Sequence, residues 1–294
     1  MKLNNIELTF ENFANEMAKL KNEKHFDYLV TIIGEDFGEE GLGCIYILEN
    51  TQNNERCSVR TIAKKVDGSD VIPTVTNLWK AADLLEREVF DFVGIKFLGH
   101  PDMRRLFLRT DFVGHPLRKD FDMSPEANKF PLTDEPEDDF TVEYSLDKDG
   151  HLVETKHRLF EEDEYVVNIG PNHPSTHGVL RLQTVIDGET VKRIYPHLGY
   201  IHRGIEKMWE GMTYPQTLAL TDRLNYLSAM MHRHALVGVI EEAMGIELSD
   251  RIRYIRTIMD ELQRIDSHLL FLGCTAQDLG ALTAFLYCMR DREH

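Results

Sequence analysis

The stretch Asn168–Arg181, which reads N-I-G-P-N-H-P-S-T-H-G-V-L-R, decides how the second half of the chain is organised. The short apolar run Tyr165–Val167 leads into it, and its prolines and glycines exclude a continuous helix. His173 and His177 are therefore presented from a loop, where binding and catalytic side chains often lie. Two interpretations compete: a β-hairpin whose histidines bond to backbone carbonyls, or a site that hydrogen-bonds or protonates a ligand.

Two motifs that follow favour the ligand site, because the histidine loop does not stand alone. They are P-H-L-G-Y-I-H-R-G-I-E-K at residues 196–207 and D-R-L-N-Y at residues 222–226. With these motifs, residues 165–293 closely resemble the D subunit (49-kDa type) of the proton-pumping NADH:quinone oxidoreductase, respiratory complex I. The resemblance implies an oxidoreductase subunit that works in electron transport and proton transport.

The first part of the chain predicts a small α/β sandwich. Apolar residues at helical spacing predict helices over 10–22 and 76–90, and β-rich segments predict strands over 28–33, 44–48 and 57–62, in a mostly antiparallel sheet. The charged run over 86–97 and two Gly-His-Pro tripeptides, at 99–101 and 114–116, indicate either a docking surface or an irregular loop folded over its own domain. Residues 25–122 resemble the complex I C subunit (30-kDa type), which implies a structural docking module without a cofactor.

Between these parts, residues 123–164 are rich in acidic residues and contain three prolines, which predicts an extended linker. The expected domains are therefore 1–122 (C-type), the linker 123–164 and 165–294 (D-type), as in a fused C/D subunit.

In the last domain, strand-like runs over 165–169, 179–186 and 191–195 precede helical patterns over 222–244, 250–272 and 275–289. Asp187-Gly188 predicts a hairpin between the last two strands. The predicted fold class is α+β: a sandwich domain, a linker, then a small antiparallel sheet and a helical bundle. The resemblance implies a frame like that of the NiFe-hydrogenase large subunit, incomplete here, because the D-type pattern is expected to continue beyond His294. A truncated or partial subunit is therefore expected.

Composition excludes several other classes of protein. The formal net charge of −17 argues against nucleic-acid binding and against direct adsorption to anionic lipid. No stretch is long and apolar enough for a transmembrane helix, and the first residues do not read as a secretory signal. The expected location is the cytoplasmic side of the inner (plasma) membrane, as a peripheral protein held by partners. The four cysteines contain no C-x-x-C pair, which predicts reduced and mostly buried thiols.

The resemblance implies the site residues. His177 and Tyr226 match the positions that face the quinone head group, and Asp278, in A-Q-D-L-G, matches the acid that pairs with that histidine. Arg223 matches a position near the terminal iron–sulfur cluster of a partner subunit. Asn225 departs from the aspartate common in the family.

By the same resemblance, the chain binds no metal or cofactor itself, and quinone is its substrate. Its expected partners are the iron–sulfur B-type subunit, the I-type subunit and the membrane H-type subunit. Both a scaffold or assembly protein and a membrane-bound hydrogenase large subunit remain as alternatives. The hydrogenase would need a cysteine pair after the arginine of the D-R-L-N-Y motif, and residues 223–227 contain no cysteine.

Overall fold

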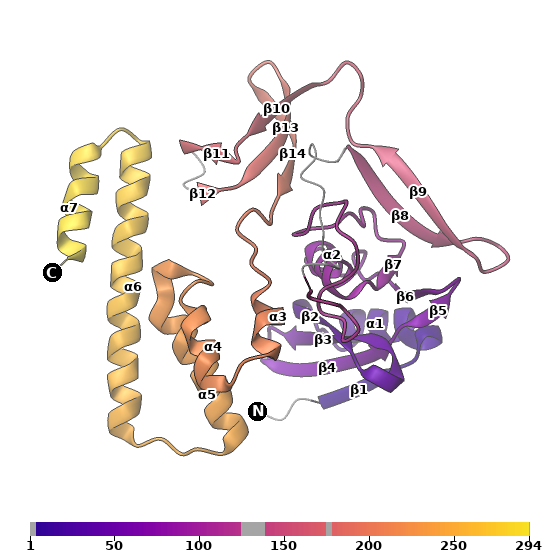
Figure 1. The fold of residues 1–294 in the computed structure, drawn as a ribbon, viewed down its shortest axis with the longest axis horizontal. Coiled ribbons are helices and arrows are strands. Elements are labelled where there is room, and N and C mark those ends of the chain that lie inside the picture. The colour runs from indigo at the N-terminus through magenta and orange to yellow at the C-terminus, as the bar shows by residue number, and fades with distance from the viewer. Residues whose placement is uncertain (1–3, 125–138, 175–177, 294) are drawn as a thin grey trace. The chain divides into compact units, whose positions relative to one another are not determined.

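The computed structural model describes residues 4–124, 139–174 and 178–293. The chain divides into two compact units, Met1–Arg203 and Gly204–His294 (Figure 1). Among the described residues, the strands lie in the first unit, together with two α-helices and the short 3-10 helix η1 (Gly38–Glu40), and the second unit is helical. The mixed helix and sheet content confirms the α+β fold class.

The N-terminal sheet has the strand order β1-β4-β3-β2. Its strands are β1 (Asn4–Leu8), β4 (Glu55–Ile62), β3 (Leu42–Asn50) and β2 (Tyr28–Asp36). Strands β2, β3 and β4 pair antiparallel, whereas β1 pairs parallel with β4. Every second side chain of β4 is buried from Cys57 onward, because one face of the sheet packs on the core. The predicted strands over 28–33, 44–48 and 57–62 are confirmed.

Two helices pack with this sheet. Helix α1 (Phe10–Asn22) buries Phe13, Met17 and Leu20, which lie on one face at helical spacing, and this confirms the helix predicted over 10–22. Helix α2 (Ala82–Val93) approaches β2 closely at Gly34, where an added Cβ would come within 2.6 Å of a Val89 methyl group. Both helices thus contribute to a single core that includes the fully buried Tyr46.

Helix α2 begins later than its apolar spacing predicts, at Ala82 and not near residue 76. The Glu86 carboxyl group accepts a hydrogen bond from the Val75 backbone N–H (2.8 Å) and lies 2.6 Å from the Thr74 hydroxyl group. These contacts fix residues 74 and 75, just before the turn over 76–78 that leads into the helix. A side chain inside the helix therefore sets where the helix starts.

A second sheet of the first unit has the order β5-β6-β7-β8-β9. Its strands are β5 (Lys64–Val66), β6 (Ser69–Pro73), β7 (Lys96–Leu98), β8 (Phe140–Leu146) and β9 (Leu152–Arg158). The pairs β6–β7 and β7–β8 are parallel, and β8–β9 is an antiparallel hairpin.

This hairpin corrects part of the expected linker, because residues 140–158 form two strands. Tyr144 of β8 is buried and lies beside β7, where Lys96 Nζ stands 4.5 Å from the centre of its ring. The ring of Phe90 on α2 is 6.4 Å away. The segment contains alternating apolar residues that are typical of a strand, but its acidic composition led to the linker prediction.

The rest of the first unit holds two small sheets, one of three strands with the order β10-β13-β14 and one of two, β11-β12. The strands are β10 (Tyr165–Ile169), β11 (Asn172–His173), β12 (Gly178–Val179), β13 (Arg181–Asp187) and β14 (Thr190–His197). The turn at Asp187-Gly188 joins β13 to β14 as predicted, and the three predicted strand runs are confirmed.

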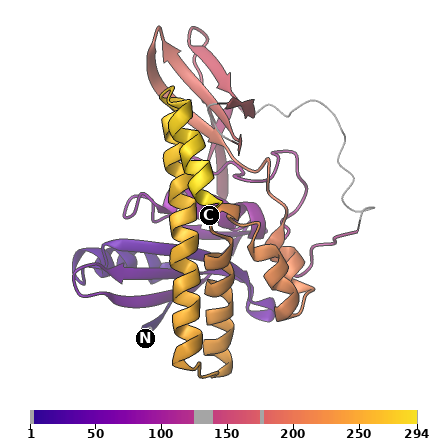
Figure 2. The ribbon, with the colours of Figure 1, turned by 90° about the vertical axis from the view of Figure 1, so that its left-hand side faces the viewer.

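The second unit consists of α3 (Ile205–Glu210), α4 (Tyr214–Thr221), the short 3-10 helix η3 (Tyr226–Ser228), α5 (Ala229–Met244), α6 (Asp250–Asp278) and α7 (Leu282–Arg292). Helices α5 and α7 both pack on the long α6 (Figure 2). The Arg256 guanidinium group bridges α6 to α5 through two 2.7 Å hydrogen bonds to Glu241.

The predicted helix boundaries of this unit need three corrections. Helix α7 starts at Leu282 and not at Thr275. Helix α5 starts at Ala229 and not at Asp222, because η3 interrupts the helical pattern. Helix α6 continues through Gly273, which the sequence suggested as its end, to Asp278. Gly273 is buried, and an added Cβ would lie 3.2 Å from Cβ of Cys288, so this glycine allows α7 to approach closely.

None of the described helices combines the length and the apolar composition needed to span a membrane. All four cysteines are free thiols, and Cys44, Cys57 and Cys288 are buried, which confirms the prediction of reduced and mostly buried thiols.

Candidate functional site

The histidine loop is built as a hairpin. Strand β10 pairs with β13 up to Ile169, and β11 then pairs with β12, so that His173 lies opposite Gly178. His173 is exposed. His177 belongs to residues 175–177, which lie outside the described residues, so its role stays a prediction. The paired strands on either side of residues 175–177 agree with the hairpin interpretation of the loop composition.

Tyr226 is the first residue of η3, and 75% of its surface is exposed. The Asn225 side-chain oxygen accepts a hydrogen bond from the Leu227 backbone N–H (3.2 Å) and caps this short helix. The Leu227 carbonyl oxygen accepts another hydrogen bond from Gln263 Nε2 on α6 (3.1 Å). The Asn225 side chain thus supplies the acceptor that shapes the turn. The phenol is therefore held outward by a turn anchored to α6.

Arg223 lies between α4 and η3 and is largely exposed. Its Nη1 donates to the Ala219 carbonyl oxygen (2.9 Å) and stands 3.8 Å from the Asp222 carboxylate, which also pairs with Arg233. The guanidinium group is thus fixed to the end of α4, and its position near a cluster stays a prediction.

Asp278 is the exposed last residue of α6. It lies about 22 Å along this helix from Gln263, the residue that anchors the Tyr226 turn, at 1.5 Å of rise per residue. The described geometry therefore does not bring Tyr226 and Asp278 together. The expected pairing of Asp278 with His177 involves a residue outside the described ranges.

Side chains that could ligate a metal do not cluster in the part of the chain that the structure describes. No group of three or more His, Cys, Asp or Glu side chains that could hold a metal ion occurs there. Helix α5 contains two histidines two positions apart, His232 and His234. His234 Nδ1 lies 2.6 Å from the Asp260 carboxylate of α6.

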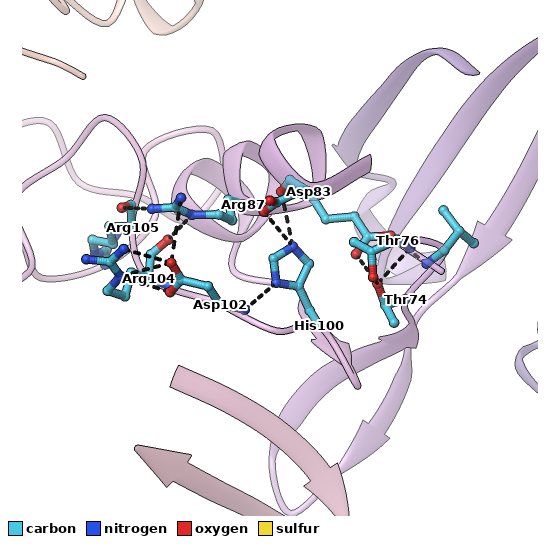
Figure 3. Close-up of polar contacts among 10 residues, drawn as sticks. Thr74, Thr76, Asp83, Arg87, His100, Asp102, Arg104 and Arg105 are labelled. Carbon is cyan, nitrogen blue, oxygen red and sulfur yellow. Dashed lines mark hydrogen bonds and ion pairs between the residues drawn. The ribbon is translucent and has the colours of Figure 1, made fainter. Parts of the chain in front are cut away.

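Sequence reasoning assigned no role to a set of buried and partly buried polar side chains around α2, most of which Figure 3 labels. We call it the α2 polar network; its members are Thr74, Thr76, Asp83, Glu86, Arg87, Asp91, His100, Asp102, Arg104 and Arg105. Its helical members recur every three or four positions, so one face of α2 carries them. That charged periodicity inside an otherwise apolar helix was the signal available in the sequence.

His100 is fully buried in this network. Its Nδ1 accepts the backbone N–H of Asp102 (3.0 Å), so its Nε2 carries the hydrogen and donates to the Asp83 carbonyl oxygen (3.1 Å). Burial lowers the pKa of His100, which favours the neutral ring. The first Gly-His-Pro tripeptide is thus fastened to α2 by an uncharged imidazole.

The Asp102 carboxylate binds the guanidinium group of Arg104 through Nε (2.9 Å) and Nη2 (2.8 Å). Burial alone would raise the pKa of Asp102, but the hydrogen bonds from Arg104 and the nearby charge of Arg87 outweigh it and lower that pKa. Arg87 in turn donates to the Arg104 and Arg105 carbonyl oxygens (3.0 and 3.1 Å).

Asp91, which is fully buried, organises the segment that follows. One of its oxygens accepts the backbone N–H groups of Leu106 (3.1 Å), Phe107 (2.7 Å) and Leu108 (2.9 Å). The other accepts a 2.8 Å hydrogen bond from Arg105. Of the two interpretations of the charged run, these contacts support the loop folded over its own domain.

Because Glu86 is titratable, the α2 polar network can be tested through the pH dependence of the free energy of unfolding. Burial raises the pKa of Glu86 from its ordinary 4.5 to about 8, against the opposing hydrogen bonds from Thr74 and Val75. The folded state therefore keeps this proton in a pH range where the unfolded chain loses it. The resulting stabilisation is complete below pH 4.5 and is lost as the pH rises through about 8. In that window, Glu86 should lower the free energy of unfolding by up to about 1.4 kcal/mol per pH unit.

We expect Glu86→Gln to remove this contribution, because the amide keeps one acceptor for Val75 and one donor for Thr74. Urea unfolding at several pH values measures it, as the difference in slope between the two proteins. Glu23→Gln, which changes an exposed glutamate after α1, should retain the wild-type slope. Equal slopes for wild type and Glu86→Gln would show that Glu86 is ionised throughout.

Comparison with known proteins gives consistent results along the chain. Residues 6–127 match the family of the respiratory-chain NADH dehydrogenase, 30 Kd subunit. The NADH-quinone oxidoreductase C/D subunit of Phocaeicola vulgatus is 55% identical over 288 residues, which cover 98% of this chain and 55% of that protein. Its counterpart from Bacteroides fragilis is 54% identical over 290 residues, covering 95% of this chain and 54% of the relative.

A more distant relative, the second C/D subunit of Aquifex aeolicus, is 42% identical over 296 residues, covering 96% of this chain and 50% of the relative. The chain thus spans about half the length of the curated relatives that it matches. The similarity extends through both units, across the C-type part, the histidine loop and the helices. The chain is therefore similar, over nearly its whole length, to about half of the NADH-quinone oxidoreductase C/D subunits that it matches.

Proposed function

We propose that this chain supplies part of the quinone site of a membrane-associated NADH:quinone oxidoreductase. The observation that carries the proposal is the placement of Tyr226: a phenol held outward on a short helix that is capped by Asn225 and anchored to α6. An exposed tyrosine on a rigid turn is suited to meet a ligand that a neighbouring protein completes. The relatives are NADH-quinone oxidoreductase subunits, and their names supply the proposed reaction.

Reduction of a quinone to a quinol consumes two electrons and two protons, one proton at each carbonyl oxygen. In this proposal the electrons come from an iron–sulfur cluster of a partner subunit. His177 and Tyr226 hydrogen-bond the two carbonyl oxygens and donate the protons. In this proposal Asp278 orients the His177 imidazole and favours its protonated form. Arg223 places a positive charge near the cluster, which favours the reduced cluster.

The proposal also covers the assembly. The iron–sulfur B-type subunit, the I-type subunit and the membrane H-type subunit are the proposed partners, and they hold the chain on the cytoplasmic side of the membrane. The α2 polar network gives the first domain a rigid loop on which such partners can dock. Reprotonation of the site after quinol forms is proposed to couple the reaction to proton translocation.

We expect Tyr226→Phe to lower the quinone-reductase kcat of the purified complex at least tenfold, because general acids contribute about 10²–10⁴-fold. Tyr254→Phe is the matched control: Tyr254 lies on α6 and is 72% exposed, close to the 75% of Tyr226. Electron transfer from NADH to a water-soluble artificial acceptor should stay unchanged in both variants, since it does not need the quinone site.

The outcomes separate the candidate roles. A selective loss of quinone reduction in Tyr226→Phe, with the complex intact, supports the site. A variant complex that assembles and reduces quinone like the wild type would contradict it and would favour a scaffold role for this chain.

A further inference from the structure

Helix α6 carries a row of polar side chains on the side that meets its neighbours in the second unit. The members recur every three or four positions, so they share one side of the helix: Arg256, Asp260, Gln263 and Asp266. The first two bind side chains of α5, Gln263 contacts η3, and Asp266 contacts α7. One row of α6 thus joins α5, η3 and α7.

The amide nitrogen of Gln263 donates two hydrogen bonds in this row. Its Nε2 lies 3.1 Å from the Leu227 carbonyl oxygen of η3 and 3.1 Å from Asp266 Oδ2. Both partners are acceptors, so each takes one of the two N–H hydrogens. The reverse orientation of the amide would place Oε1 against two oxygen atoms. Asp266 therefore helps to decide which end of the Gln263 side chain meets η3.

The Asp266 carboxylate is itself held by α7. Arg292 Nε donates to Asp266 Oδ1 (2.6 Å), and Arg292 Nη2 donates to Oδ2 (3.2 Å). A two-point contact of this kind orients the carboxylate plane and still leaves an acceptor site for Gln263. The contacts therefore run without a break from α7 through Asp266 and Gln263 to the backbone of η3.

These contacts matter for Tyr226 because its own side chain is not packed. Tyr226 precedes Leu227 in η3, and 75% of its surface is exposed. The direction of the phenol is therefore set by the backbone of η3. The hydrogen bond from Gln263 is made to that backbone, directly after Tyr226.

We propose that Asp266 is a positioning residue for the reaction of Tyr226. The inference rests on the proposed function, because it assigns Asp266 to the same quinone site. The role of Asp266 is indirect: it orients the Gln263 amide, the amide fixes η3, and η3 directs the phenol toward the quinone oxygen. A general acid must lie within hydrogen-bond reach of the atom that it protonates, so a displaced η3 lowers kcat.

The first part of the test uses Asp266→Leu in the purified complex. Leucine is similar in size but cannot accept the hydrogen bond from Gln263. We expect hydrogen exchange over residues 225–228 to quicken and the quinone-reductase kcat to fall about fivefold or more. Gln263→Leu removes the contact to η3 without changing Asp266 or Arg292, and it should give the same two effects.

Two further variants serve as rescue and control. Asp266→Asn retains a side-chain oxygen that can accept from Gln263 Nε2, so it should restore exchange and kcat to near the wild-type values. Glu242→Leu replaces an exposed glutamate of α5 and should change neither. A loss in Asp266→Asn as large as that in Asp266→Leu would contradict the role of the acceptor.

A double-mutant cycle separates positioning from general damage to the fold. In a Tyr226→Phe background, Asp266→Leu should lower kcat by less than about twofold further, because the hydroxyl group that it positions is already gone. Independent, multiplicative losses would overturn the proposal, and so would unchanged exchange over residues 225–228 in Asp266→Leu. A wild-type rate in Tyr226→Phe would contradict the proposed function instead, and the exchange data would still decide whether Asp266 fixes η3.

Discussion

Asp91→Ala should lower the free energy of unfolding of the first unit by about 3–5 kcal/mol, the range measured when one partner of a buried ion pair is removed. Three backbone N–H groups, those of Leu106, Phe107 and Leu108, would lose their acceptor together. Arg105, whose side chain is only 11% exposed, would keep a positive charge without its carboxylate. The full burial of the Asp91 side chain keeps solvent from replacing these bonds.

Urea unfolding followed by tryptophan fluorescence measures this loss. Trp79 is buried in the core of the first unit, and Trp209→Phe as a common background leaves it as the reporter. Asp111→Ala is the control, because its pair with Arg109 lies nearer the surface, and it should cost about 1 kcal/mol or less. If Asp91→Ala and Asp111→Ala lower the free energy of unfolding equally, the hydrogen bonds of Asp91 do not stabilise the fold as argued.

Gly170→Ala is expected to have the second large effect, at the entrance to the histidine loop. Gly170 has a φ of 90°, and an added Cβ would come within 1.9 Å of the Leu180 carbonyl oxygen. Alanine therefore meets backbone strain of roughly 1–3 kcal/mol and, in addition, an overlap that only movement of β10 or β13 can relieve. We expect a total loss of about 2–6 kcal/mol in the free energy of unfolding.

Gly150→Ala separates strain from overlap. Gly150 has nearly the same φ, 87°, but nothing lies within 4 Å of an added Cβ. Gly150→Ala should therefore lower the free energy of unfolding only by the cost of backbone strain. Hydrogen exchange over residues 165–187 should quicken in Gly170→Ala and not in Gly150→Ala, and quinone reduction by the complex should fall only in the former. Similar behaviour of the two variants would exclude the close backbone approach as the cause.

The sequence predicted the elements whose signal is local. The stripe of Phe13, Met17 and Leu20 predicts α1 because three residues at helical spacing need only their own helix to share a face. Asp187-Gly188 predicts the β13–β14 turn for a similar reason, since turn chemistry acts within a few residues. The motifs likewise pointed to the family before the fold was known.

Elements that depend on distant partners were missed or misplaced. Residues 140–158 read as a linker because their acidic composition is visible locally, whereas the pairing of Tyr144 with β7 is not. Gly273 suggested a helix end, and only its contact with α7 explains why α6 continues through it. The predicted site shows the same dependence: Tyr226 was expected inside a helix, and Asn225 places it on η3 instead.

Periodic helices and strands, turns and the family resemblance could be predicted from the sequence, because each depends on short-range geometry or on a motif. Only the tertiary structure decided which charged residues are buried. Glu86, Asp91 and His100 look like surface residues in the sequence, and they become core residues because backbone N–H, carbonyl and guanidinium groups from other segments satisfy them. A charged group can be buried only where folding brings polar partners from other segments next to it, and a local sequence pattern does not show these partners.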